Sequence, residues 1–267
     1  MSSPRVLGWR TEANPGLDKA VPRAACIAEA DPGPTYMTVL HGLSRSNPCV
    51  YPGGTAVTCN PPQWFERFIT TPRLAPYQGA AKRGGTHAEE LYRWNMQASE
   101  AFYPALSCLE ICFRNALDEQ LRARYRRADW WVSARLASHH SDKVKGVSSD
   151  LVRWKGYAPS PDDIVAELSF GFWVALLSRR YDRHLWVPAL HRAFPGYHGA
   201  REPLRDSFEA MSFFRNRVMH HEPIHHRDLA ADHAKIYRLL GYIEPDAVIW
   251  LREFDRAPEV LAMRPGR

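Results

Sequence analysis

The sequence has few cysteines, and none of them is spaced to bind zinc or to form a disulfide framework. There are five among 267 residues, an odd number, and no two are arranged as Cys-x-x-Cys. This usage is typical of buried thiols in a reducing compartment. No window approaches the ~18 uninterrupted apolar residues of a membrane span. The opening MSSPRVLGWRTEANPG lacks the apolar core of a signal peptide. Together these absences predict a cytoplasmic protein with no membrane partner.

Phosphate-binding and hydrolase motifs are absent too. There is no Gly-rich phosphate loop, no G-x-S-x-G motif and no dinucleotide fingerprint, and the Gly84-Gly85 pair follows no predicted strand. We therefore expect no cofactor. The net charge of +6 and the pI of about 9.1 are compatible with a nucleic-acid partner but do not by themselves indicate one.

The chain divides into two parts by composition. Residues 1–60 are rich in Pro, Gly, Ser and Ala without sustained periodicity, which predicts a low-order N-terminal leader. From Pro61 the apolar residues recur at spacings of three and four, which predicts an all-α domain over 61–267.

The longest predicted helix runs to about Arg127. A capping box of Thr86 and Glu89 is expected to start it, and Pro104 is expected to kink or divide it. A short helix is predicted at 61–69, stopped by Thr71-Pro72. Further helices are predicted near 130–138, 142–154, 162–168, 169–181, 184–193, 201–221, 228–241 and 245–263, with Asp162, Ser169 and Asp228 as caps.

The stretch FFRNRVMHHEPIHH, residues 213–226, matches two different chemistries. His221-Glu222-Pro223-Ile224-His225 has the HExxH spacing of zinc hydrolases, which requires both histidines on one face of a continuous helix. Pro223 lacks an N–H and clashes with the preceding turn, so the helix is expected to end near His221 or Glu222. The sequence therefore predicts no metal site here.

The second match is R-N-x-x-x-H, formed by Arg215, Asn216 and His220. Arg215 continues the apolar stripe of the 201–221 helix, so its charge needs a partner, for instance Glu110 of the long helix. Asn216 and His220 are four residues apart and share a helix face. A guanidinium, an amide and an imidazole can bind a phosphodiester and move its protons without a metal ion.

This pattern resembles the conserved motif of the HEPN superfamily, and in particular of bacterial Abi-like (abortive infection) proteins. The residues that carry the resemblance are RNRVMHHEPI at 215–224, LYRWNMQASEAFYPALSCLEICFRNALDEQL at 91–121, LSFGFWVALLSRRYDRHLW at 168–186 and AFPG at 193–196. The resemblance implies a HEPN-like helical bundle with additional helices. It also implies a homodimer in which the motifs of two protomers form a composite endoribonuclease site.

Carried over residue by residue, the family motif falls on Arg215, Asn216 and His220 as catalytic residues. His221 also fits the permitted spacing and stays open as an alternative. The resemblance implies an RNA substrate such as tRNA, a role in antiviral defence or toxin-like growth arrest, and an antitoxin as a further partner. Some members of the family are inactive forms that bind RNA or protein, so a non-catalytic binding module remains the alternative.

Three further residues are predicted to support the site. Glu110 and Arg114 are four apart on the long helix, and their simplest interpretation is a mutual salt bridge. The functional interpretation places one of them beside the histidine. Arg217, four residues before His221, is predicted to contact RNA.

Overall fold

The computed structural model describes residues 63–266, and these are helices joined by turns. No strand occurs among them, so the predicted all-α class is confirmed for this part of the chain. None of the described helices is both long enough and apolar enough to cross a membrane. The predicted leader, residues 1–60, lies outside the described residues.

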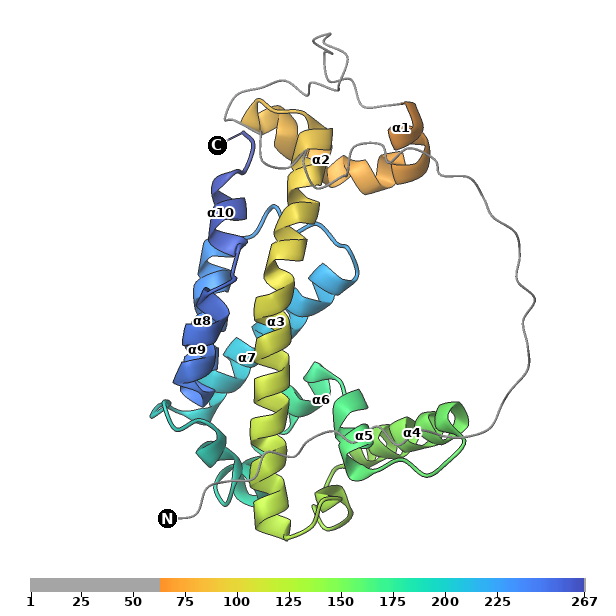
Figure 1. The fold of residues 1–267 in the computed structure, drawn as a ribbon, viewed down its shortest axis with the longest axis vertical. Helices are drawn as coiled ribbons and strands as arrows, with labels where there is room; N and C mark the ends of the chain where they lie inside the picture. Colours follow the sequence, from red (N-terminus) through yellow and green to blue (C-terminus); the bar gives the residue numbers. More distant parts are fainter. Residues whose placement is uncertain (1–62, 267) are drawn as a thin grey trace, which may run out of the picture. The chain divides into compact units, whose positions relative to one another are not determined.

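Helix α3, Ala88–Tyr125, is the axis around which the other helices pack (Figure 1). Its 38 residues span about 57 Å at 1.5 Å per residue. One face is fully buried along most of this length, including Phe102, Leu109 and Leu117. Pro104 does not divide the helix, because buried neighbours on either side pack well enough to offset the missing backbone hydrogen bond.

The predicted start of this helix was wrong by one residue. The N-cap position is His87, whose side chain makes no capping bond. The hydroxyl of Thr86 donates instead to the carboxylate of Glu90 at 2.6 Å. The Thr86–Glu89 capping box is therefore not formed.

Helices α8, α9 and α10 line one side of α3 (Figure 1). Helix α8 is Leu229–Ile243, α9 is Pro245–Arg252 and α10 is Ala257–Ala262. The helix predicted over 245–263 is thus two helices, with Asp255 in the turn between them. Its carboxylate accepts hydrogen bonds from His233, Tyr237 and the Ala257 N–H, which fixes the turn against α8.

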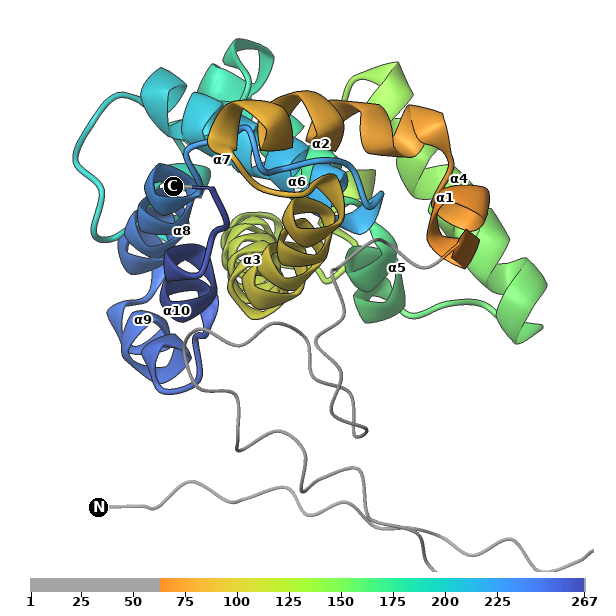
Figure 2. The same cartoon turned by 90° about the horizontal axis from the view of Figure 1, so that it is seen from above.

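Helix α7, Arg201–Met219, crosses α3 (Figures 1 and 2). Aromatic contacts hold the two helices together: Phe208 stacks on Phe113 with ring centroids 4.1 Å apart, and Phe214 meets Phe102 edge-on at 4.9 Å. The predicted apolar stripe through Leu204, Phe208, Met211 and Val218 is buried.

Within the described part of the chain two helices precede α3, of which the second was not predicted. Helix α1 is Gln63–Ile69 and α2 is Thr71–Gly84. Pro72 ends the first helix and lies at the first turn of the second, a position where proline is favourable. Helix α2 packs on α3 through Leu74, Tyr77 and Ala81.

The segment between α3 and α7 is less regular than predicted. It contains α4, Ser138–Lys155, α5, Pro161–Glu167, and α6, Phe170–Ala175, together with short turns at Trp130–Val132, Arg179–Tyr181, Asp182–Trp186 and Leu190–Ala193. The helix predicted at 169–181 is confirmed over its first half by α6, whereas those predicted at 130–138 and 184–193 are replaced by short 3-10 and π-helical turns.

Two of the three predicted caps are confirmed. The side chains of Ser169 and Asp228 accept from backbone N–H groups three residues later. Asp162 is not a cap: the N-cap of α5 lies two residues earlier, at Ser160, which forms a reciprocal capping box with Asp163.

Candidate functional site

Helix α7 ends at Met219 in a tight backbone turn, and four histidines follow: His220, His221, His225 and His226. The N–H of His221 donates to the Val218 carbonyl at 3.1 Å, and the N–H of Glu222 donates to the Arg217 carbonyl at 2.8 Å. This is the Schellman arrangement, in which the residue after the cap is left-handed and usually glycine. Here that residue is His221, with φ of 57°.

This turn separates the two histidines of the HExxH string. The helix ends at Met219, two residues before the predicted position, and Pro223 lies in the turn. His221 is exposed, whereas His225 is 4% exposed. The two side chains therefore do not share a helix face. Residues 63–266 contain no group of three His, Cys, Asp or Glu side chains that could hold a metal ion.

The guanidinium of Arg215 forms an ion pair with Glu110. Arg215 Nε lies 2.9 Å from Glu110 Oε2, and the two side chains are 34% and 20% exposed. The partner predicted for an arginine on the apolar stripe is thus present. A second nitrogen, Nη1, lies 3.4 Å from Asn216 Oδ1. The structure therefore brings Arg215, Glu110 and Asn216 together.

His220 lies one turn beyond Asn216. The Asn216 carbonyl accepts the His220 N–H at 2.9 Å, and both side chains are exposed. The end of α7 therefore presents the Asn216 amide and the His220 imidazole to solvent, one helical turn apart.

Arg114 does not join this group. It donates to Asn115 at 3.1 Å and to the Ala166 carbonyl of α5 at 3.2 Å. The expected Glu110–Arg114 salt bridge was therefore wrong, because Glu110 pairs with Arg215 across the helix interface. The contacts of Arg114 link α3 to α5.

Arg217 points its charge toward the same turn. Its Nη2 lies 3.4 Å from Glu222 Oε2, with the side chains 36% and 46% exposed. An exposed pair of this kind is weak. The guanidinium can exchange Glu222 for a phosphate at little cost.

Asn95 on α3 is a residue of the site that sequence reasoning missed. It is 3% exposed, and its Oδ1 accepts the N–H groups of Ile224 at 2.8 Å and His225 at 3.0 Å. One buried amide thus holds the turn that follows α7. The only signal in the sequence is an asparagine on an otherwise apolar helix face, four residues after Leu91.

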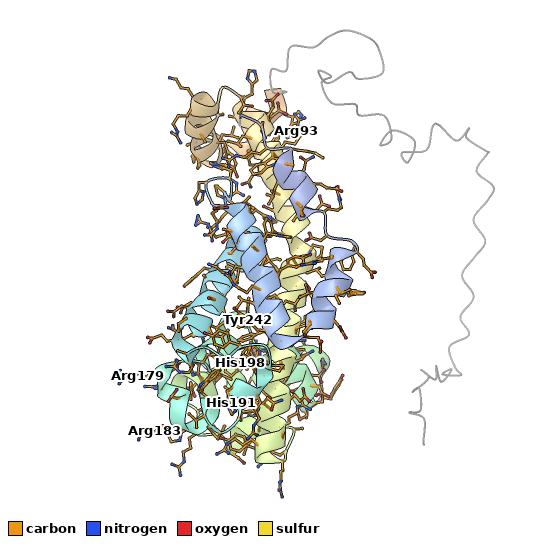
Figure 3. The ribbon with its side chains drawn as sticks, turned by 90° about the vertical axis from the view of Figure 1, so that its left-hand side faces the viewer. Arg93, Arg179, Arg183, His191, His198 and Tyr242 are labelled. Carbon is orange, nitrogen blue, oxygen red and sulfur yellow. The ribbon has the colours of Figure 1, made fainter. Side chains whose placement is uncertain are left out.

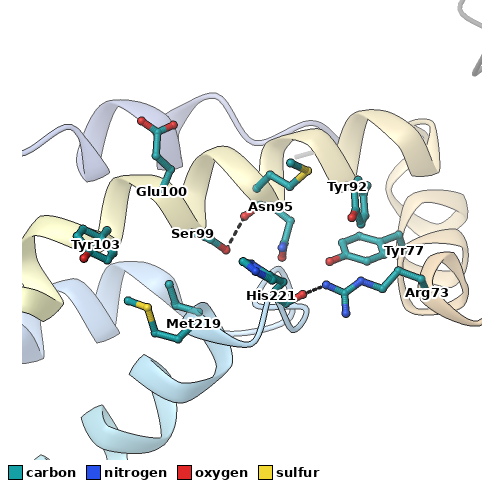
Figure 4. A pocket seen from close by; sticks show the side chains of 11 residues that line it. Arg73, Tyr77, Tyr92, Asn95, Ser99, Glu100, Tyr103, Met219 and His221 are labelled. Atoms are coloured by element: carbon teal, nitrogen blue, oxygen red, sulfur yellow. Dashed lines mark hydrogen bonds between the residues drawn. The ribbon is translucent and has the colours of Figure 1, made fainter. Parts of the chain in front are cut away.

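A cavity of about 560 Å³ opens between α2, α3 and the end of α7 (Figure 4). Its walls include Tyr77, Tyr92, Tyr103, Met96 and Met219. At one end Arg73 of α2 donates to the backbone carbonyl of His221. The cavity was not predicted because α2, which forms this end of it, was not predicted.

His225 and Tyr77 are buried side by side next to this cavity, with ring centroids 4.8 Å apart. Burial lowers the pKa of His225 to about 4, assisted by nearby cationic side chains, and raises the pKa of Tyr77 to about 12. Neither the Tyr77 hydroxyl nor the His225 ring nitrogens have a hydrogen-bond partner within the described part of the chain.

A cluster of exposed arginines lies at the opposite end of α7 (Figure 3). We call it the arginine face; its members are Arg179, Arg180 and Arg183, all exposed and without a carboxylate partner within residues 63–266. The one acid among them, Asp182, is paired with Arg201 at 2.9 Å. Buried side chains in the same segment as the arginines, such as Tyr181 and Leu185, anchor the turns that carry them.

No protein-family model, curated protein or solved structure matches this chain. Its function therefore has to be inferred from its own residues and their contacts.

Proposed function

We propose that this protein is a metal-independent endoribonuclease of the Abi-like type within the HEPN superfamily, with its catalytic site at the end of α7. The observation that carries the proposal is that Arg215, held by Glu110, contacts the Asn216 amide, and that Asn216 and His220 are both exposed one turn apart at the end of α7. The biological role that fits is abortive-infection defence against phage.

The proposed reaction is transesterification by the ribose 2′-OH. An imidazole takes the 2′-OH proton, a bond forms between O2′ and phosphorus, and the bond from phosphorus to O5′ breaks. A second imidazole protonates the leaving O5′. The products carry a 2′,3′-cyclic phosphate and a 5′-hydroxyl. Arg215 offsets the charge that develops on the phosphate oxygens.

A homodimer provides the two imidazoles that this reaction uses. In a HEPN-like bundle the two His220 side chains would meet in one composite site. The large apolar side chain of Phe213 supports such an interface, because it is 64% exposed near the end of α7.

The arginine face supports RNA as the substrate. Three exposed guanidinium groups without carboxylate partners among the described residues form a favourable surface for phosphates. The 19 residues of α7 span about 28 Å between this face and the catalytic end. A folded RNA with a stem of that length, such as tRNA, could contact both.

The alternative function is a non-catalytic HEPN module that binds RNA or protein. One observation favours it: Glu110 already neutralises much of the Arg215 charge that catalysis would use. The two functions differ in whether a phosphodiester is broken.

A cleavage assay separates them. The full-length protein would be incubated with total RNA and with a tRNA pool in the presence of EDTA, beside His220→Ala, His221→Ala and a matched control. The control is His87→Ala, which removes an exposed histidine at the start of α3. We expect cleavage by wild type and by the control, loss in His220→Ala, and 2′,3′-cyclic phosphate ends.

Other outcomes would contradict parts of the proposal. Loss in His221→Ala alone moves the catalytic residue by one position. Inhibition by EDTA or products with 3′-hydroxyl ends contradict the mechanism. No cleavage by folded, dimeric protein, combined with salt-dependent RNA binding, favours the binding module.

A further inference from the structure

The cavity beside the end of α7 has one polar end and one apolar end. The guanidinium of Arg73 and the hydroxyl of Tyr77 mark the polar end, whereas Met96, Tyr103 and Met219 line the other (Figure 4). A ligand that fits this gradient carries an anionic group on a flat, largely apolar body. The volume of about 560 Å³ lies within the range of small-molecule sites.

Two groups at the polar end lack the partners that their chemistry demands. The Tyr77 hydroxyl is fully buried, points into the cavity in Figure 4, and has no hydrogen-bond partner among the described residues. Such a group is costly unless a ligand or water satisfies it. Arg73 donates to a carbonyl but has no carboxylate partner within residues 63–266, so its charge can bind an anion.

The walls of the cavity suit an aromatic ring. Tyr77 and Tyr92 meet edge-on with centroids 5.0 Å apart, and Tyr103 lies further along the same helix as Tyr92. Methionine sulfurs and tyrosine faces are both favourable neighbours for a base. Glu100, the one carboxylate on the wall, is paired with Arg256 at 3.5 Å, which offsets its charge toward an anion bound near Arg73.

We propose that this cavity binds one nucleotide, with its phosphate at Arg73 and Tyr77 and its base between Tyr103, Met96 and Met219. The nucleotide is either free or one residue of an RNA chain. The second source rests on the proposed ribonuclease function, and the first does not.

The occupied cavity would act directly on the catalytic end of α7. His221 and Met219, which lie on either side of His220, line it, and the guanidinium that would bind the phosphate also holds the His221 carbonyl. A phosphate at Arg73 therefore competes with the contact that fixes the left-handed residue. As part of an RNA chain, the bound nucleotide would be a neighbour of the one whose 2′-OH reacts.

The test uses direct binding to the full-length protein, followed by calorimetry and by tyrosine fluorescence. The probes are AMP, GMP, CMP and UMP, and an oligonucleotide with 2′-deoxy sugars that cannot be cleaved. Met96→Glu places a negative charge in the cavity from a residue that is 57% exposed, so the fold should tolerate it. The matched control is Ile111→Glu, an equally charged change at an exposed apolar residue of the same helix outside the cavity.

We expect wild type and Ile111→Glu to bind, and Met96→Glu to bind more weakly by roughly tenfold or more because like charges repel. Binding of mononucleotides but not of the oligonucleotide identifies a free nucleotide as the ligand. Binding of both, with competition between them, identifies a residue of the RNA chain. No binding to folded wild-type protein, or equal binding by Met96→Glu, overturns the inference.

This result is independent of the cleavage assay. Nucleotide binding that Met96→Glu weakens, by a protein that cuts no RNA, would support the cavity and contradict the ribonuclease. Cleavage by a protein whose cavity binds none of the probes would do the reverse.

Discussion

The amide of Asn95 is expected to contribute measurably to the free energy of unfolding. Replacing it by alanine removes the acceptor for two backbone N–H groups, those of Ile224 and His225. Both residues are buried, with exposed fractions of 0% and 4%, so water cannot easily replace the lost acceptor. The Asn95→Ala protein would thus retain two buried donors without partners.

The expected cost follows from that count. A buried donor left without a partner costs about 1–3 kcal/mol, so two donors together should lower the free energy of unfolding by roughly 2–6 kcal/mol. The loss of a hydrogen bond that leaves no buried donor or acceptor without a partner costs only about 1 kcal/mol. The difference between these two figures is large enough to measure.

Urea unfolding of the full-length protein, followed by far-UV circular dichroism, measures this change. The matched control is Ser99→Ala, one turn further along α3. The Ser99 hydroxyl donates to the Asn95 carbonyl at 2.8 Å, and its removal leaves no buried donor without a partner. We expect Ser99→Ala to cost about 1 kcal/mol or less.

The reasoning would be refuted by an Asn95→Ala protein that loses no more stability than Ser99→Ala. That result would mean that the turn after α7 finds other partners for its N–H groups. A loss in the expected range, together with loss of RNA cleavage, would show that the turn must be held for the site to work.

Three other changes test separate parts of the structure. Lowering the pH from 7 to 5 should cost about 2 kcal/mol of stability for each of His140 and His225, because burial lowers their folded-state pKa values to about 4 whereas an unfolded histidine titrates near 6.5. This stability is present above pH 6.5 and is lost as the pH falls toward 4; urea midpoints that do not change would contradict it. A double-mutant cycle of Arg215→Ala and Glu110→Ala should give a coupling energy of about 1 kcal/mol, and additive effects would argue against the ion pair. His221→Gly should raise the melting temperature by relieving about 1 kcal/mol of left-handed strain, whereas a lower melting temperature would mean that the imidazole is needed for folding.

Much of the helical framework could be predicted because its cause is local. Apolar residues at spacings of three and four predicted α3, α7 and α8, and Pro223 predicted that α7 ends before the last histidines. An arginine on an apolar stripe predicted a carboxylate partner, and the structure supplies Glu110. Each of these inferences needs only one helix and its immediate chemistry.

The errors arose where one residue type has two opposite uses. A proline ends a helix, but it also favours the first turn of the next one, so the stop predicted at Thr71-Pro72 concealed α2. Between 169 and 193 the apolar residues are dense enough to suggest long helices. After α6, however, this segment forms only short helical turns, and Ser178 and Pro188 lie between them.

The remainder of the site depends on contacts between distant segments. Asn95 meets the turn after α7 across more than a hundred residues of sequence. The cavity requires α2, α3 and the end of α7 to be in place together. Neither the Asn95 contact nor the cavity could be predicted from residue spacing, because both depend on segments that are distant in the sequence.

The continuity of α3 has a mechanical consequence. Helix α3 contacts the end of α7 and the following turn at two points. Glu110 forms an ion pair with Arg215, and Asn95 accepts a hydrogen bond from the Ile224 N–H. Along α3, Asn95 and Glu110 are about 22 Å apart at 1.5 Å per residue. Pro104, which has no backbone N–H to donate, lies between them. A bend at Pro104 would change the distance between Asn95 and Glu110. Asn216 and His220 lie between these two contacts along the chain. Bending of α3 would therefore change their positions.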